Sequence, residues 1–115
     1  MSRLTGDDLL WNWCRWCWSG TGDISMYDED VTPVPVNMDH ALAVEAMHAA
    51  LPWHERMVII AEYPQKRERF SGLTAFERRT AARRWIEDAT GIRLGDTEYK
   101  LYLGLFRDHV ERKLA

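Results

Sequence analysis

The residues best suited to chemistry are two cysteines separated by a single helical turn, Cys14 and Cys17. Thiolates at this spacing bind metals or exchange disulfides. A structural zinc site needs four ligands, usually from two such pairs, and the chain has no second pair of cysteines. His40, His48 and His54 would have to supply the other ligands, at spacings that match no standard zinc finger. We therefore expect packed structural thiols, with a zinc module and a redox site as alternatives.

The rest of the sequence has no set of residues typical of an active site. It contains no phosphate-binding glycine loop, no histidine pair of a metalloprotease and no serine elbow. Most carboxylates stand at expected helix starts or beside arginines, where a structural role explains them. We expect a protein that is not an enzyme, with no cofactor, no metal and no small-molecule substrate.

Basic residues are concentrated in the second half of the chain. Residues 1–60 hold three basic and nine acidic side chains, whereas residues 61–115 hold twelve basic and nine acidic ones. Such an asymmetry can direct one face of a protein toward phosphates. The residues that we predict to contact nucleic acid, by positioning phosphates rather than by reading bases, are Lys66, Arg67, Arg69, Arg78, Arg79, Arg83 and Arg84.

A structural explanation of the helical arginines stays open beside that one. Arg83 and Glu87 are four residues apart, as are Arg84 and Asp88, so ion pairs on a solvated helix face would account for them. The other predicted contacts, in the loop and at the start of the helix, are less fully neutralised by acidic residues. They are the better candidates for phosphate binding.

These cations flank and enter a predicted pair of helices within residues 73–114. Thr74 opens a capping box with Glu77, the first helix ends at a glycine, and the second opens at Asp96 or Thr97. Each helix carries one apolar stripe, formed by Ala82, Trp85, Ile86 and Ala89 on the first and by Tyr99, Tyr102, Leu103, Phe106 and Val110 on the second. We expect the two stripes to bury each other, as in a helix-turn-helix.

Four tryptophans fall on a predicted N-terminal helix that opens with a cap signal at Thr5 and Asp8. Its main apolar stripe contains Leu10, Trp13, Cys14 and Cys17, while Trp11 and Trp18 lie on another side. One helix face cannot bury all four indoles. Either the loop that follows the helix folds over the second face, or Trp11 and Trp18 bind a partner protein.

Residues 19–36 form the one long segment with the composition of an irregular loop. Glycines, alternating prolines and an acidic cluster disfavour a helix there. The segment is either a solvated connector or an acidic strip, anchored by Tyr27, that binds a basic partner protein.

Two further helices complete the predicted fold. Asn37 caps a helix that runs through Ala50 and places His48 in the core, and Pro52 opens another that stops before Pro64. At 115 residues the chain forms one all-α domain of about five helices with a C-terminal helix-turn-helix-like pair. No apolar run is long enough to span a membrane and no secretion signal is visible, so we expect a cytoplasmic protein.

The order of these elements resembles that of small bacteriophage late-gene regulators related to Q-like antitermination proteins. The resemblance covers nearly the whole chain and rests on Trp11, Trp13 and Trp16, on the helix text from Asp39 through Val44 and Glu45 to Ala50-Leu51-Pro52, on Arg56 and Tyr63, and on the C-terminal helical pair. It implies a helix-turn-helix similar to region 4 of bacterial sigma factors and contact with host RNA polymerase.

The sequence thus leads to two expectations of function. One is a bacteriophage-type, antiterminator-like transcription regulator that acts in the host bacterial cell, engages RNA polymerase and contacts DNA through the basic loop and helix. The other is a non-enzymatic inhibitor that binds a host complex, either RNA polymerase or a defence system, and does not touch DNA. Its support is the acidic first half of the chain.

Overall fold

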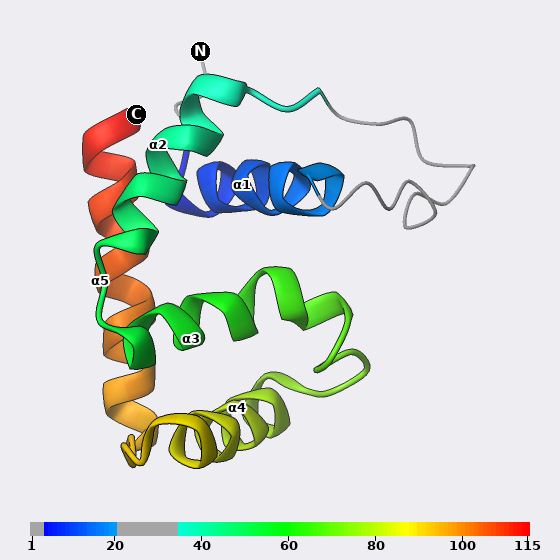
Figure 1. Ribbon diagram of the computed structural model, residues 1–115, viewed down its shortest axis with the longest axis vertical. Helices are drawn as coiled ribbons and strands as arrows, with labels where there is room; N and C mark the ends of the chain where they lie inside the picture. The colour runs from blue at the N-terminus through cyan, green and yellow to red at the C-terminus, as the bar shows by residue number, and fades with distance from the viewer. Residues whose placement is uncertain (1–3, 21–34) are drawn as a thin grey trace.

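The computed structural model describes residues 4–20 and 35–115, and within these ranges it is entirely helical (Figure 1). The elements in chain order are α1 (Gly6–Gly20), α2 (Met38–Ala49), α3 (Trp53–Glu62), the 3-10 turn η2 (Pro64–Arg67), α4 (Ala75–Thr90) and α5 (Asp96–Leu114). The predicted all-α fold of five helices is confirmed. Predictions for residues 21–34, including Tyr27, lie outside the described residues. None of the helices in the described ranges combines the length and hydropathy needed to cross a lipid bilayer.

Side-chain caps start the helices where the sequence predicts them. In α1, Thr5 Oγ1 accepts the N–H of Asp8 at 3.1 Å, and the Asp8 carboxylate accepts the N–H of Thr5 at 3.0 Å. Thr74 and Glu77 repeat this reciprocal pair at the start of α4, at 3.2 and 2.9 Å. Asn37 caps α2 by accepting the N–H of residue 40 at 3.0 Å. These caps fix the starts of three helices because each satisfies a backbone donor that has no partner within its helix.

Three predicted boundaries shift by one or two residues. Helix α2 ends at Ala49, and Ala50 is its C-cap and not its last residue. Helix α1 continues to Gly20, so the irregular segment does not begin at residue 19 as predicted. Pro52 is the N-cap of α3 and not its first residue. The apolar run in α3, which by composition alone would also suit a buried strand, is helical.

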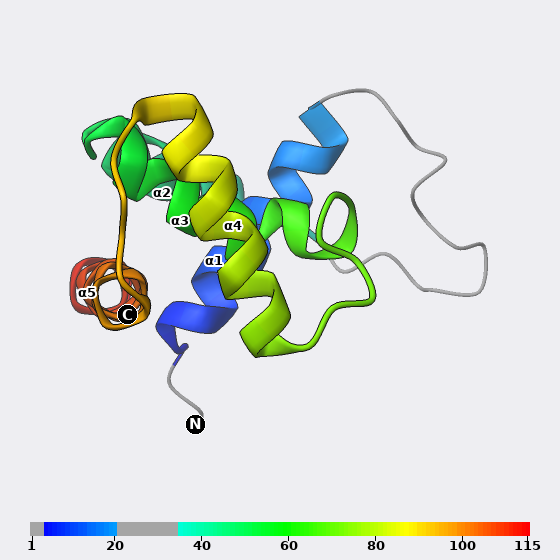
Figure 2. The ribbon, with the colours of Figure 1, turned by 90° about the horizontal axis from the view of Figure 1, so that it is seen from below.

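Helix α5 runs along the long axis of the molecule, while α1, α3 and α4 extend to one side of it (Figure 1). Seen from below, α5 is viewed end-on and α4 crosses in front of α3 (Figure 2). The core lies between these helices, and its largest fully buried side chains include Tyr63, Tyr99, Leu9, Leu10, Met57, Ile59 and Ile86.

The two C-terminal stripes meet mainly other helices and not each other, contrary to expectation. Helix α4 packs more extensively against α3 than against α5, and α5 packs more extensively against α1 and α3 than against α4. Ala82 and Ile86 are buried, but Ala89 is exposed at the end of the predicted stripe. The reason is that α3 is apolar on more than one side, with Met57, Val58 and Ile59 all buried, and it packs against both α4 and α5. The last two helices therefore form no self-contained unit.

Helices α1 and α5 approach each other most closely at Gly6. Its N–H donates to Glu111 Oε1 at 3.0 Å, and a Cβ atom built there would overlap the carbonyl oxygen of Arg107. Only glycine permits this approach.

The core also contains two side chains that the sequence placed there. Cys14 is fully buried, and burial raises the pKa of its thiol. His48 is 2% exposed and lies between Trp13 and Phe106, with ring centroids 4.8 and 6.0 Å away. The predictions of a packed Cys14 thiol and a core histidine are confirmed.

Candidate nucleic-acid interface

The segment between α3 and α4 is a tight loop held at both ends by buried aromatic rings. Tyr63 and Phe70 are only 1% and 4% exposed. Between them, the N–H of Phe70 donates to the carbonyl oxygen of Gln65 at 3.0 Å, which closes the turn that Pro64 begins. Gly72 then takes a left-handed φ of +80°, a conformation that favours glycine. The loop presents three cations on its surface, Lys66, Arg67 and Arg69.

Two of these cations lie over the indoles that α1 leaves outside the core. Arg67 Cζ is 5.0 Å from the ring centroid of Trp11 and 5.9 Å from that of Trp18. Lys66 Nζ is 5.7 Å from the Trp11 centroid. The two indoles are themselves neighbours, with centroids 6.4 Å apart. Part of their cover thus comes from η2, an element distant in sequence, whereas most of the loop predicted to cover them lies outside the described residues.

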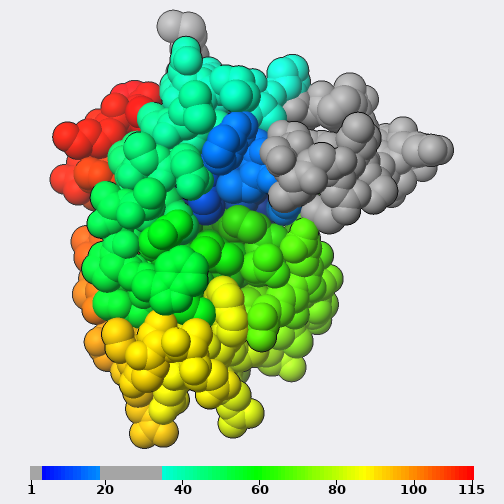
Figure 3. All heavy atoms as spheres, viewed as in Figure 1, coloured from blue at the N-terminus to red at the C-terminus, as the bar shows by residue number. Residues whose placement is uncertain are grey.

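The third cation lies over a tryptophan of another helix. Arg69 Cζ is 5.1 Å from the centroid of Trp85 in α4, and Phe70 packs edge-on against that indole at 5.8 Å. In the space-filling view, the light green loop borders the blue helix α1 (Figure 3). We name this surface the basic–aromatic patch and define it as Lys66, Arg67, Arg69, Trp11, Trp18 and Trp85.

The cations of the patch form no ion pair with the residues that the structure describes. Lys66, Arg67 and Arg69 are exposed, and none of them belongs to an ion pair formed within residues 4–20 and 35–115. The interaction of a cation with an indole face is worth about 0.5–1 kcal/mol at exposed sites, and it leaves the charge of the cation intact. The patch therefore attracts anions.

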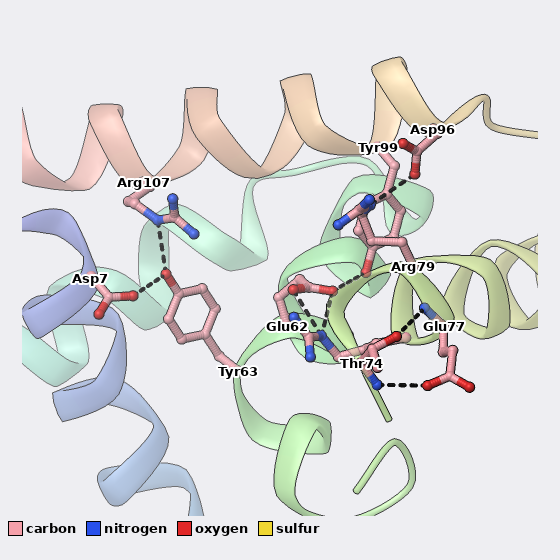
Figure 4. Close-up of polar contacts among 10 residues, drawn as sticks. Asp7, Glu62, Tyr63, Thr74, Glu77, Arg79, Asp96, Tyr99 and Arg107 are labelled. Atoms are coloured by element: carbon pink, nitrogen blue, oxygen red, sulfur yellow. Dashed lines mark hydrogen bonds and ion pairs between the residues drawn. The ribbon is translucent and has the colours of Figure 1, made fainter. Parts of the chain in front are cut away.

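Arg78 has a different environment from the loop cations. Its Nε donates to both carboxylate oxygens of Glu62 at 3.0 Å. Tyr99 Oη donates to the same carboxylate at 2.8 Å (Figure 4). Arg78 and Glu62 are each 8% exposed. We name these three residues the buried junction; it ties α4 to α3 and α5. Arg78 was predicted to contact phosphate, and the structure places it where its charge is neutralised inside the protein.

Arg79 is also engaged within the protein. Its Nε donates to Asp96 Oδ1 at 2.8 Å, and this bond holds the pKa of Asp96 below its ordinary value (Figure 4). The pair joins α4 to the first residue of α5. Arg79 is half-buried, so it is less accessible to a ligand than the loop cations are.

The last two predicted phosphate contacts lie farther along α4. Arg83 is half-buried and its Nε has no hydrogen-bond partner, whereas Arg84 is exposed. Arg84 borders a shallow groove of about 360 Å³ with Leu73 and Phe76. The expected local ion pairs are not formed in the described ranges; Glu87 pairs instead with Arg93, at 3.5 Å.

Helix α5 offers few groups for reading base edges. Arg107 donates from Nε to Tyr63 Oη at 2.9 Å, and that hydroxyl donates to Asp7 at 2.8 Å (Figure 4). Lys100 pairs with Asp96 at 3.3 Å within the helix. The outward side of α5 instead carries two leucines, Leu101 and Leu105, each 55% exposed.

The structure brings together two sets of residues that the sequence treated separately. Trp11 and Trp18, predicted to bind protein, lie beneath Arg67, predicted to bind nucleic acid. Trp85 also belongs to this surface through its contact with Arg69, although it was predicted only as part of a core stripe. The sequence carries one local sign of this contact, because Arg69 is followed directly by the aromatic Phe70. The indole that both residues contact, however, belongs to another helix.

The cysteines lie apart from this surface chemistry. Burial raises the pKa of Cys17 to about 12, so both thiols stay protonated near neutral pH. Among the residues that the structure describes, no three histidine, cysteine or acidic side chains gather closely enough to hold a metal ion.

The sequence matches no protein-family model, and neither a curated protein nor a solved structure matches it.

Proposed function

We propose that this chain is a small, non-enzymatic transcription regulator of the bacteriophage antiterminator-like type, which engages host RNA polymerase and contacts DNA through the basic–aromatic patch. It would act inside the host bacterial cell. The observation that carries the proposal is the group of three exposed cations, Lys66, Arg67 and Arg69, without an ion-pair partner in the described ranges. Unneutralised cations on one surface are the usual means by which proteins bind phosphates.

The contacts to DNA would position the protein and not specify a sequence. Arg84, and Arg83 in part, extend the charge along α4, while Arg78 and Arg79 act indirectly by fixing α4 against α3 and α5. The low number of base-reading side chains on α5 argues against sequence readout by that helix.

RNA polymerase would be bound by a surface that includes the indoles of Trp11 and Trp18. Tryptophan is enriched at the energetic centres of protein interfaces. Since the loop cations lie over these rings, polymerase and DNA would be bound at adjoining positions.

Affinity capture from bacterial lysate tests this function. The tagged full chain is incubated with lysate, with and without nuclease, and the bound proteins are identified by mass spectrometry. We expect RNA polymerase subunits that persist after nuclease treatment. A different single complex, captured in the absence of polymerase, would refute the regulator proposal.

A second candidate is a protein-binding inhibitor of a host complex that does not contact DNA. It is favoured by Leu101 and Leu105, which give α5 an exposed apolar side that DNA binding does not use. Salt separates the two candidates. Binding through several phosphates weakens steeply between about 50 and 200 mM salt, whereas a complex held by leucines does not.

A further inference from the structure

We infer that the basic–aromatic patch binds single-stranded nucleic acid in preference to duplex, with unpaired bases stacking on the guanidinium planes of Arg67 and Arg69 and phosphates contacting Lys66. The inference deepens the proposed function, because it names the ligand class of the same surface.

The first argument is that two planar guanidinium groups lie over indole rings. The guanidinium of Arg67 lies over two indoles, at 5.0 and 5.9 Å, and that of Arg69 lies over a third at 5.1 Å. Both arginines are exposed, so each guanidinium contacts an indole and is also accessible from solvent. A base has a π-face that stacks on such a plane.

The second argument is that a duplex hides the surfaces that these planes bind. In double-stranded DNA the base faces are stacked on one another, and only edges and phosphates are accessible. Single strands expose base faces, and sequence-tolerant binders of single strands combine a basic surface with planar stacking groups. The patch has both features, whereas α5 presents few groups that read base edges.

The third argument concerns the position of the supports. Arg67 lies over rings of α1, and Arg69 lies over a ring of α4. The loop therefore places one guanidinium group beside each of these two helices. Lys66, over Trp11, adds a compact charge suited to phosphate. A strand that crosses the loop would thus meet two stacking planes and one phosphate contact.

An acidic peptide is the main competing ligand. It would use the charges equally well, but it would gain nothing from the planarity of guanidinium. Arg67→Lys separates the two, because lysine keeps the charge and loses the plane.

The test is a fluorescence-anisotropy titration of the full chain with labelled oligomers of thymidine or uridine, of about 16 nucleotides, and with a duplex of equal length. We expect either single strand to bind at least about tenfold more tightly than the duplex at equal salt. The two oligomers distinguish DNA from RNA as the source of the single strand, and a preference for either supports the inference.

The variants make the test specific to stacking. Arg67→Lys should weaken single-strand binding by about tenfold, since one base stack is lost, and should leave duplex binding nearly unchanged. The matched control is Arg93→Lys, because Arg93 is 84% exposed on its side chain and lies outside the patch. Circular dichroism confirms that each variant is folded.

Three results would overturn the inference. These are equal affinity for single strand and duplex, an Arg67→Lys variant with unchanged affinity, and complete competition by polyglutamate at equal charge. Tight duplex binding with polymerase capture would leave the proposed function standing while the inference failed. Absence of binding to every nucleic acid would remove the DNA contact from the proposed function and the inference together.

Discussion

The buried junction and the basic–aromatic patch take their arginines from one short stretch of sequence but use them differently. In the junction, Arg78 is enclosed with a carboxylate and a tyrosine hydroxyl. In the patch, Arg67 and Arg69 lie over indoles and form no ion pair within residues 4–20 and 35–115. A buried cation needs a partner because desolvation is costly, whereas an exposed one keeps most of its hydration. The comparison separates arginines that hold the fold from arginines that are available to a ligand.

Removing the junction cation should give the largest loss of stability. Arg78→Ala should lower the free energy of unfolding by about 3–5 kcal/mol, because Glu62 would stay buried and charged. Urea denaturation followed by tryptophan fluorescence measures the loss. The same change at Arg67 should cost less than about 1 kcal/mol.

A double variant sharpens that result. Glu62→Gln combined with Arg78→Ala removes the stranded charge and should recover part of the stability. Equal losses for Arg78→Ala and Arg67→Ala would break the distinction between junction and patch.

A substitution at the close approach of α1 to α5 tests whether another interior contact is as sensitive to mutation as the junction is. Gly6→Ala should destabilise the fold by about 1–3 kcal/mol, because the added methyl group overlaps the Arg107 backbone. Gly104→Ala is the matched control on α5: its Cβ has open space, and it should stabilise the helix by about 0.5–1 kcal/mol. Thermal denaturation measures both, and stabilisation by Gly6→Ala would contradict the packing described.

Acidification should weaken the interior through His48. Burial lowers the pKa of His48 from its ordinary 6.5, so the unfolded chain binds more protons than the folded one. Stability should therefore be full above about pH 6.5 and decline as the pH falls toward the lowered pKa. Urea denaturation from about pH 7.5 to 5.5 measures the decline, which His48→Gln should reduce.

The control for this pH effect is His40→Gln, at the half-buried start of α2. An undiminished pH dependence in the His48 variant would assign the effect to other groups. The binding assays of the patch are made near neutral pH, where the loss of stability on acidification does not affect them.

The smallest effect is expected from a single patch cation. Lys66→Gln should change stability by less than about 0.5 kcal/mol, since the side chain is exposed. It should lower the slope of log affinity against log salt by about 0.7–0.9, because one phosphate contact is lost. Arg112→Gln, which is exposed on α5, should leave that slope unchanged. A patch variant with the slope of the unaltered protein would show that Lys66 does not meet phosphate.

The sequence alone determined the helices, since local signals set where helices start and stop. Thr5, Asn37 and Thr74 form the caps that their spacing predicts, because a cap acts over three residues and needs no tertiary contact. The burial of Cys14 and His48 followed from apolar periodicity in the same way.

Only the tertiary structure decided which arginines are neutralised and which indoles meet cations. Arg78 and Glu62 lie in different helices, sixteen residues apart, and neither residue type nor local spacing predicts that they pair. The same holds for the cover that Arg67 gives to Trp11 and for the packing of α4 on α3. Helix formation depends on neighbours along the chain, whereas the environment of a charged side chain depends on which helices meet, and that depends on how all the apolar faces are buried together.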